Sequence, residues 1–275
     1  MHKHTKNCYE NCIRAKCRIS NEVWAKMRPI LARILLFAPT GRPRNDLRRS
    51  MNGIYYCLKT GVQWNWLPLC FGSDAAIHKL FQNLVRMGFF KCFWQAELYE
   101  AEKKGLLDLS VQALDTAHIK APLGQELTGK SPVDRAKLGS KRSMISDKNG
   151  IPIGFALGSG NQHDSTLFHD TLASIPTWLP QPFGKELHLD AAYDSEEVRT
   201  ILFNFDYVPK ICVNRRRSKI APKKVIPRHR WVIEPVHSWV NRFRRLFVRF
   251  DKYAANYEGL VHFALGLIVF KKLGV

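Results

Sequence analysis

The chain has 275 residues, which is enough for one large domain or two modest ones. It carries 43 Lys and Arg against 23 Asp and Glu, a formal net charge of +20, so the expected partner is a polyanion. Nucleic acid is the first candidate. The sequence has no apolar run long enough to span a bilayer and no basic start leading into an apolar signal core, which argues against a membrane partner and predicts a cytoplasmic protein.

The seven cysteines do not form a disulfide pattern. Their number is odd, and four of them stand among apolar residues, where free thiols behave as small hydrophobes. Two histidines stand near Cys8, Cys12 and Cys17, but the spacing of these cysteines includes no CxxC pair. A zinc site is therefore the weaker alternative to a loose polar tail over residues 1–22.

Three helices are predicted in the first part of the chain. Apolar residues at helical spacing indicate a first helix over residues 23–36. Asp46 is expected to cap a second helix that ends at Gly61. Ser73 is expected to cap a third helix that ends at Gly88.

Basic residues are concentrated in the same region, because residues 1–60 hold 13 Lys and Arg against three acids. Three short helices with this excess fit a helix-turn-helix type DNA-binding domain over residues 23–100, although a helical bundle with a solvated basic face has the same pattern. The GRPR tetrapeptide at 41–44 could place arginines in a minor groove or serve only as a linker. The DNA contacts predicted here are Arg42, Arg44, Arg48 and Arg49.

From residue 106 the hydrophobic pattern changes from helical spacing to an alternation of apolar and polar residues, which predicts a strand ending at Asp115. The change also indicates a second domain, which we place over residues 101–275. The DKNG turn at 147–150 lies between two apolar segments and predicts an antiparallel hairpin. The elements expected afterwards are a helix capped by Asp164, a strand over 186–190, a helix over 194–205, a strand over 208–213 and a long helix over 230–250. This order predicts an α/β (α+β) fold with a ribonuclease-H-like mixed sheet and flanking helices.

Three carboxylates stand in surroundings that require an explanation. Asp115 and Asp190 each end an apolar strand, and Glu234 lies beside apolar residues in a predicted helix. A carboxylate at the end of a core strand costs several kcal/mol to desolvate unless it is paired or coordinates a cation. Each alone could reach water or an arginine. Together, on two strand ends and a facing helix, they would form a site for divalent metal.

Motifs in a fixed order resemble the DDE transposases of the insertion-sequence families four and five, over about residues 25 to 270. In the second half they are LDTAHIKAP at 114–122, DRAKLGSKR at 134–142, GNQHD at 160–164, LDAAYD at 189–194 and RWVIEPVHSWVNRFRR at 230–245. In the first half GRPR at 41–44, NGIYY at 52–56, TG at 60–61, Trp64 and WLP at 66–68 resemble the N-terminal domain that accompanies this catalytic domain.

The resemblance implies that Asp115, Asp190 and Glu234 hold two Mg²⁺ ions, with Mn²⁺ as a substitute. It implies a bacterial, nucleoid-associated enzyme that cuts DNA at the terminal inverted repeats of its element and joins the 3′ ends to target DNA, as a homodimer or larger assembly without a small-molecule cofactor. Two ions suit this chemistry, because one activates the attacking oxygen and the other stabilises the leaving one. Asp194 competes for the second position, but the DSEE sequence that it begins has the spacing of a capping box.

Pro235 departs from the family pattern, in which arginine usually follows the glutamate. Either the helix begins near Ile233, where proline is tolerated, or the chain is a catalytically decayed DNA-binding relic. A ribonuclease-H-like nuclease that cuts without joining is a further alternative. The helical N-terminal region favours a transposase, because finding an element end needs a recognition domain.

A second basic segment extends over residues 207–252, with 14 Lys and Arg and two acids. Aromatic residues recur in it at helical spacing, so part of it is expected to fold, with its arginines around the helix that bears Glu234. These side chains are expected to touch phosphates rather than read bases. The DNA contacts predicted in the second domain are Lys141, Arg142, Arg215, Arg216, Arg217, Arg242, Arg244 and Arg245.

Overall fold

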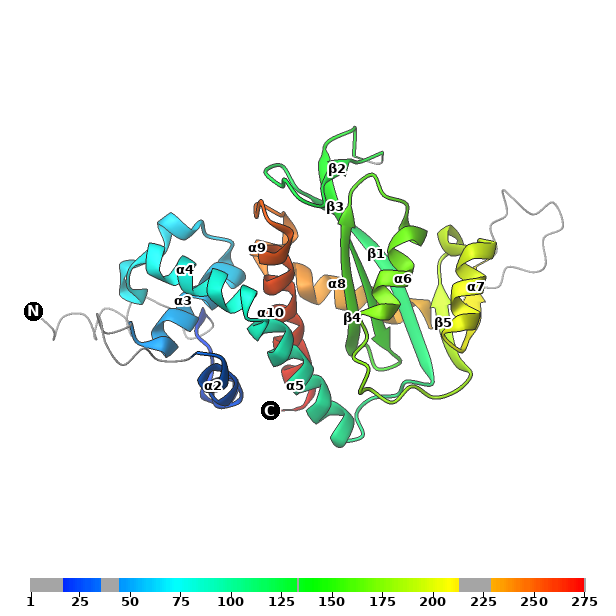
Figure 1. The fold of residues 1–275 in the computed structure, drawn as a ribbon, viewed down its shortest axis with the longest axis horizontal. Helices are drawn as coiled ribbons and strands as arrows, with labels where there is room; N and C mark the ends of the chain where they lie inside the picture. Colours follow the sequence, from blue (N-terminus) through cyan, green and yellow to red (C-terminus); the bar gives the residue numbers. More distant parts are fainter. Residues whose placement is uncertain (1–16, 36–44, 133, 213–228, 275) are drawn as a thin grey trace, which may run out of the picture.

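The structure, a computed structural model, describes residues 17–35, 45–132, 134–212 and 229–274. Helices gather at one end of the molecule and a sheet with its flanking helices at the other, with two long helices between them (Figure 1). Within the described residues, no helix combines the length and the apolar composition needed to cross a membrane.

Two of the helices in the N-terminal half, α3 and α4, begin at their predicted capping residues. The described helices there are α2 (Asn21–Ile34), α3 (Leu47–Thr60), α4 (Asp74–Arg86) and α5 (Phe89–Lys103), with short 3-10 turns η2 (Trp64–Trp66) and η3 (Leu69–Phe71) between α3 and α4. The Asp46 side chain accepts a hydrogen bond from the Arg49 amide, and the Ser73 side chain accepts one from the Ala76 amide. Gly61 ends α3 in the left-handed conformation, with φ +75°, which favours glycine.

The sheet is parallel on one side of β1 and antiparallel on the other. Its strands are β1 (Val111–Lys120), β2 (Gly129–Lys130), β3 (Leu138–Asp147), β4 (Pro152–Ser159), β5 (Lys185–Leu189) and β6 (Tyr207–Ile211). β1 pairs antiparallel with β3, which pairs antiparallel with β4, while β5 runs parallel to β1 and β6 parallel to β5. The order β4-β3-β1-β5-β6 is that of a ribonuclease-H-like sheet. The two-residue β2 pairs antiparallel with the start of β3, at Leu138 and Gly139.

The predicted hairpin is confirmed: β3 and β4 meet at a turn in which the Gly150 amide donates to the Asp147 carbonyl. Two predicted caps are wrong. His163, not Asp164, caps α6 (Asp164–Ala173), because the His163 side chain accepts from the Ser165 amide. Ser195, not Asp194, caps α7 (Glu196–Asn204), where its hydroxyl accepts from the Val198 amide. Asp194 pairs instead with Arg199 at 2.7 Å, and the 3-10 turn η4 (Ala191–Tyr193) lies between β5 and α7.

The long helix predicted over residues 230–250 is also wrong. The chain forms a 3-10 turn η5 (Arg230–Val232), then α8 (Ile233–Asn241), then the short α9 (Arg244–Phe247). The break comes at Phe243, whose backbone is extended at φ −84° and ψ 100°. No proline or glycine stands there. The change of direction lets Phe243 and Leu246 enter the core and turns Arg245 inward.

α6 and α8 cover opposite faces of the sheet. Neighbouring residues of a strand point to opposite faces, and Arg142 of β3 bonds Asn241 of α8, while Ser143 bonds Thr171 of α6. Helix α10 (Ala254–Lys272) then returns to pack along α5 (Figure 1). One continuous core therefore joins the helical layer to the sheet. The boundary predicted between residues 100 and 101 falls inside α5.

Candidate active site

Asp115 lies in the middle of β1 rather than at its end, which corrects the sequence-based placement. Its side chain shares a sheet face with Arg142, because Arg142 stands opposite Ala117, two residues further along β1. This is the face that α8 covers. The Asp115 carboxylate accepts a hydrogen bond from the Thr116 amide at 2.8 Å.

Burial is the main cause that raises the pKa of Asp115. The Thr116 amide and the charge of Arg230 lower this pKa, while the negative charges of Asp190 and Asp164 raise it further. A carboxylate that is desolvated beside other carboxylates is poorly stabilised as an anion. A positive charge next to the Asp115 carboxylate would offset the free-energy cost of burying its negative charge.

Asp190 follows β5 directly and lies next to Asp115. β1 and β5 are parallel, and Ala113 stands opposite His188. Asp115 and Asp190 each come two residues later, so both side chains point to the same face of the sheet. The effect of the Asp190 charge on the pKa of Asp115 agrees with this placement. Asp190 is held in place by a hydrogen bond from the Ala191 amide to its carboxylate at 2.7 Å. The structure therefore brings Asp115 and Asp190 together.

Glu234 does not join them. It lies in the first turn of α8 with its side chain 59% exposed, and its carboxylate pairs with the guanidinium of Arg230 at 3.6 Å. In the described part of the chain, no three His, Cys, Asp or Glu side chains gather closely enough to hold a metal ion. The donor types nevertheless fit Mg²⁺, since carboxylate oxygens are its preferred ligands and Asp115 is a desolvated one.

Pro235 is accommodated by the fold. α8 begins at Ile233, so Pro235 lies in the first turn of this helix, where a missing amide hydrogen breaks no helical hydrogen bond. Of the two alternatives that Pro235 left open, the structure shows the helix start near Ile233.

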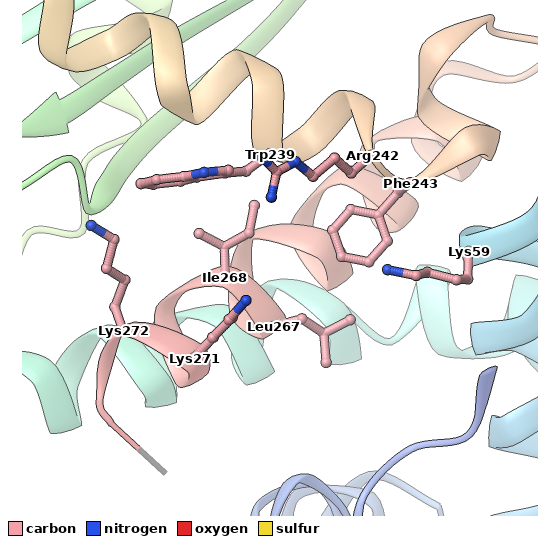
Figure 2. Close-up of a pocket in the computed structure, with 8 residues that line it drawn as sticks. All are labelled: Lys59, Trp239, Arg242, Phe243, Leu267, Ile268, Lys271 and Lys272. Atoms are coloured by element: carbon pink, nitrogen blue, oxygen red, sulfur yellow. The ribbon is translucent and has the colours of Figure 1, made fainter. Parts of the chain in front are cut away.

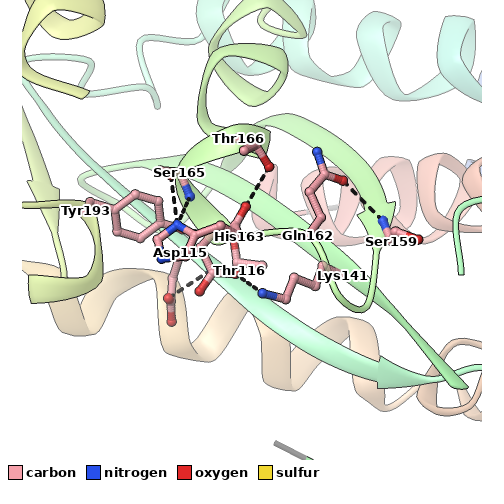
Figure 3. A network of polar contacts seen from close by, with 10 residues as sticks. Asp115, Thr116, Lys141, Ser159, Gln162, His163, Ser165, Thr166 and Tyr193 are labelled. Carbon is pink, nitrogen blue, oxygen red and sulfur yellow. Dashed lines mark hydrogen bonds and ion pairs between the residues drawn. The ribbon is translucent and has the colours of Figure 1, made fainter. Parts of the chain in front are cut away.

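Polar residues on the α6 side of the sheet lie beside Asp115, and two of them, Thr116 and Tyr193, were missed by sequence reasoning (Figure 3). The Tyr193 hydroxyl lies 2.8 Å from the Thr116 hydroxyl, next to Asp115 in the chain, and burial raises the pKa of Tyr193. Lys141, predicted to contact DNA, pairs with Asp164 at 2.8 Å and is only 14% exposed. The LDAAYD and GNQHD motifs contain Tyr193 and Asp164, so membership of a motif was the available signal.

Two of the arginines predicted to bind DNA are buried, and this corrects their assignment. Arg142 is fully buried and donates to the Asn241 side chain at 2.8 Å. Arg245 is also buried and pairs with Asp251 at 3.0 Å. A buried cation requires partners inside the protein, so neither guanidinium is presented to a ligand in this conformation.

The remaining predicted contacts divide into three groups. Arg242 and Arg244 are exposed. Arg48 and Arg49 are half-buried, and they donate to the Asn21 side chain and to the Cys70 carbonyl. The predicted contacts that lie outside the described residues are Arg42, Arg44, Arg215, Arg216 and Arg217.

Cys8 and Cys12, and with them most of the predicted tail and of the alternative zinc site, lie outside the described residues. The described cysteines are free thiols, and Cys17 is among them.

A sheet of this order, with one acidic residue on β1 and a second directly after the neighbouring parallel strand β5, defines a ribonuclease-H-like protein. Residues 107–267 match the family described as "Transposase DDE domain", and residues 19–94 match the one described as "Putative transposase of IS4/5 family". The first match covers more than half of the chain. The chain therefore belongs to the DDE transposase family, and this membership implies the use of divalent metal.

Two relatives come from Burkholderia cepacia. The "Putative transposase for insertion sequence element IS402" is 33% identical over 136 residues, which span 48% of this chain and 63% of that protein. The "Insertion element IS402 uncharacterized 16.2 kDa protein" is 26% identical over 141 residues, spanning 47% of this chain and 91% of that protein. Among solved structures, a piggyBac transposase in a synaptic complex with hairpin DNA aligns over 98% of this chain and 75% of its own, at 9% identity and a TM-score of 0.49.

Proposed function

We propose that this chain is a transposase that cuts DNA at the ends of its insertion element and joins the freed 3′ ends to target DNA. One observation carries the proposal. Asp115 on β1 and Asp190, directly after the parallel strand β5, each lie two residues beyond the paired Ala113 and His188, inside a region that matches a transposase DDE domain. Asp115 is also desolvated, which is the state of a carboxylate adapted to meet a cation.

Asp115, Asp190 and Glu234 would hold two divalent cations, Mg²⁺ or in its place Mn²⁺. When bound, such ions supply the positive charge that activates an attacking oxygen and stabilises a leaving one. The chain supplies orientation: amide hydrogen bonds from Thr116 and Ala191 fix the two aspartates. Glu234, on the helix that covers the same sheet face, would complete the set by leaving Arg230.

DNA would be held by exposed cations near α8. Arg242 and Arg244 follow Glu234 closely in the chain and are exposed, and the strong net positive charge favours a polyanion throughout. The helical segment over residues 23–100 would recognise the terminal inverted repeats, and a homodimer or larger assembly would bring two ends together. Backbone contacts give affinity, whereas selectivity for the ends needs contacts to bases.

Cutting and joining test the proposal directly. The inverted repeats that flank the gene give the DNA substrate, and the purified full chain with Mg²⁺ is expected to nick it at the element end and join it to a target. Asp115→Asn keeps the side-chain shape but removes a metal-holding charge, so both steps should fall by several orders of magnitude while DNA binding persists. Asp170→Asn, an exposed carboxylate on α6, is the matched control and should leave both steps unchanged.

The other outcomes contradict the proposal in distinct ways. A chain that binds the ends but performs neither step, with every divalent ion tried, would be the decayed relic. A chain that nicks without joining would be a nuclease. Full activity of Asp115→Asn would refute the assignment of the site.

A further inference from the structure

A basic pocket lies on another side of α8, where α3, α8 and α10 meet (Figure 2). Its volume is about 340 Å³, near the lower end for small-molecule sites and too small for a duplex. It is lined by Lys59, Trp239, Arg242, Phe243, Leu267, Ile268, Lys271 and Lys272. Trp239 follows Glu234 by five residues, or about 140° around a helix, so the pocket does not belong to the candidate active site.

The charge of the pocket is of one sign. Four cationic side chains line it and no acidic one does. In the described part of the chain, no carboxylate pairs with Lys59, Arg242 or Lys271, and Lys272 donates to the Asn149 carbonyl at 3.0 Å. Cations that line one pocket without a carboxylate among them give it a positive potential, which favours an anionic ligand.

The walls of the pocket add aromatic surface. Lys272 lies 4.5 Å from the centre of the Trp239 ring, and Lys59 lies 5.2 Å from that of Phe243. Trp239 is half-buried, so part of its ring remains open to the pocket, and Leu267 and Ile268 provide an apolar floor. Aromatic rings beside cations are the combination by which proteins bind unpaired nucleotides, with the base stacked and the phosphate on Lys or Arg.

We infer that this pocket binds a single nucleotide, with its base against Trp239 and its phosphate on Lys59, Arg242 and Lys271. The inference goes beyond the proposed cutting reaction and does not depend on it. The nucleotide is either an unpaired one in a DNA strand or a free one, since the recognising chemistry is the same.

Binding of a fluorescent single-stranded oligonucleotide, without divalent metal, tests the inference independently of catalysis. The pair Lys59→Gln and Lys271→Gln, made together, is expected to weaken binding about tenfold and to reduce the salt dependence of the affinity by about one phosphate contact. Lys103→Gln with Lys104→Gln removes the same charge from exposed positions at the end of α5 and should change little.

The base is tested separately. An oligonucleotide with abasic sites has the same charge and should bind the parent on the order of tenfold more weakly than the intact strand, whereas Trp239→Leu should bind both alike. Competition by a free nucleoside monophosphate at micromolar concentration would identify the free source, and competition only by single strands would identify the DNA source. An equal loss of oligonucleotide affinity in the two double lysine variants would overturn the inference. So would a parent protein that binds intact and abasic strands equally well. The comparison of the lysine variants remains valid even if Trp239→Leu fails to fold.

Discussion

The guanidinium of Arg230 lies 3.6 Å from the carboxylate of Glu234, one helical turn further along the chain. The same arginine lowers the pKa of Asp115 through its positive charge. Arg230 therefore supplies positive charge to two of the three carboxylates proposed to hold metal. In this arrangement the arginine competes with a divalent cation for the same negative charge.

Replacing this arginine should strengthen metal binding. Arg230→Gln removes the competing charge and frees Glu234, so Mn²⁺ should bind about two- to fivefold more tightly, a range set by the modest strength of an exposed ion pair. Calorimetric titration of the full chain without DNA measures this, and Lys148→Gln, which breaks the exposed pair with Asp108, is the control. Weaker Mn²⁺ binding in Arg230→Gln would show that the arginine supports the site rather than competing for it.

The buried carboxyl of Asp115 should make the fold less stable at neutral pH. Its pKa is raised in the folded protein, so its contribution to stability is present in acid and is lost as the pH rises through the folded pKa. At pH 7 the unfolding temperature of Asp115→Asn should therefore be a few degrees higher than that of the parent, and this difference should vanish below about pH 4. Thermal unfolding at both pH values measures this, and a variant less stable than the parent at pH 7 would contradict it.

Much of the fold was predictable because local signals mark it. Asp46, Ser73 and the turn at 147–150 place their elements correctly, since caps and tight turns depend on neighbouring residues. α5 and α10 were not foreseen as elements. Both are apolar on several sides because they pack against each other, so neither has the single stripe that identifies a surface helix.

The site was predictable only in part. Parallel pairing brings Asp115 and Asp190 together as expected, but the partner of Glu234 depends on a side-chain choice between Arg230 and the carboxylates, which sequence spacing does not decide. Adjacent basic residues were also ambiguous. Arg142 and Arg245 each directly follow another basic residue in the chain. The register of β3 decides which residue of the first pair is buried, and the break before α9 decides this for the second pair.

The adjacent arginines Arg244 and Arg245 should have separable effects. Arg245→Ala leaves Asp251 as an unpaired buried charge, so it should lower the free energy of unfolding by about 3–5 kcal/mol. Arg244→Ala removes an exposed charge and should leave stability within about 0.5 kcal/mol of the parent while weakening DNA binding. Urea unfolding and DNA titration of both variants measure this. A destabilised Arg244→Ala with a stable Arg245→Ala would reverse the assignment.

A buried histidine should make the protein sensitive to acid. Burial, reinforced by the charge of Arg142, lowers the pKa of His237 to about 3. Folding lowers the pKa of such a histidine, so its contribution to stability is present at pH values above its unfolded pKa of about 6.5. This contribution is lost as the pH falls below that value. His237→Leu should therefore lose less stability than the parent between pH 7 and pH 5 in urea unfolding, whereas the exposed His169→Leu should follow the parent. Equal losses in the parent and His237→Leu would contradict this account.

The proposed joint use of Asp115, Asp190 and Glu234 is tested most directly by locating metal in the protein bound to its element-end DNA. Anomalous scattering from Mn²⁺ in crystals of that complex would give the ion positions. The account predicts two ions about 4 Å apart, in contact with all three carboxylates, and Glu234 released from Arg230. Ions held by other residues, or a Glu234 carboxylate that stays on Arg230 more than about 10 Å from the ions, would contradict it.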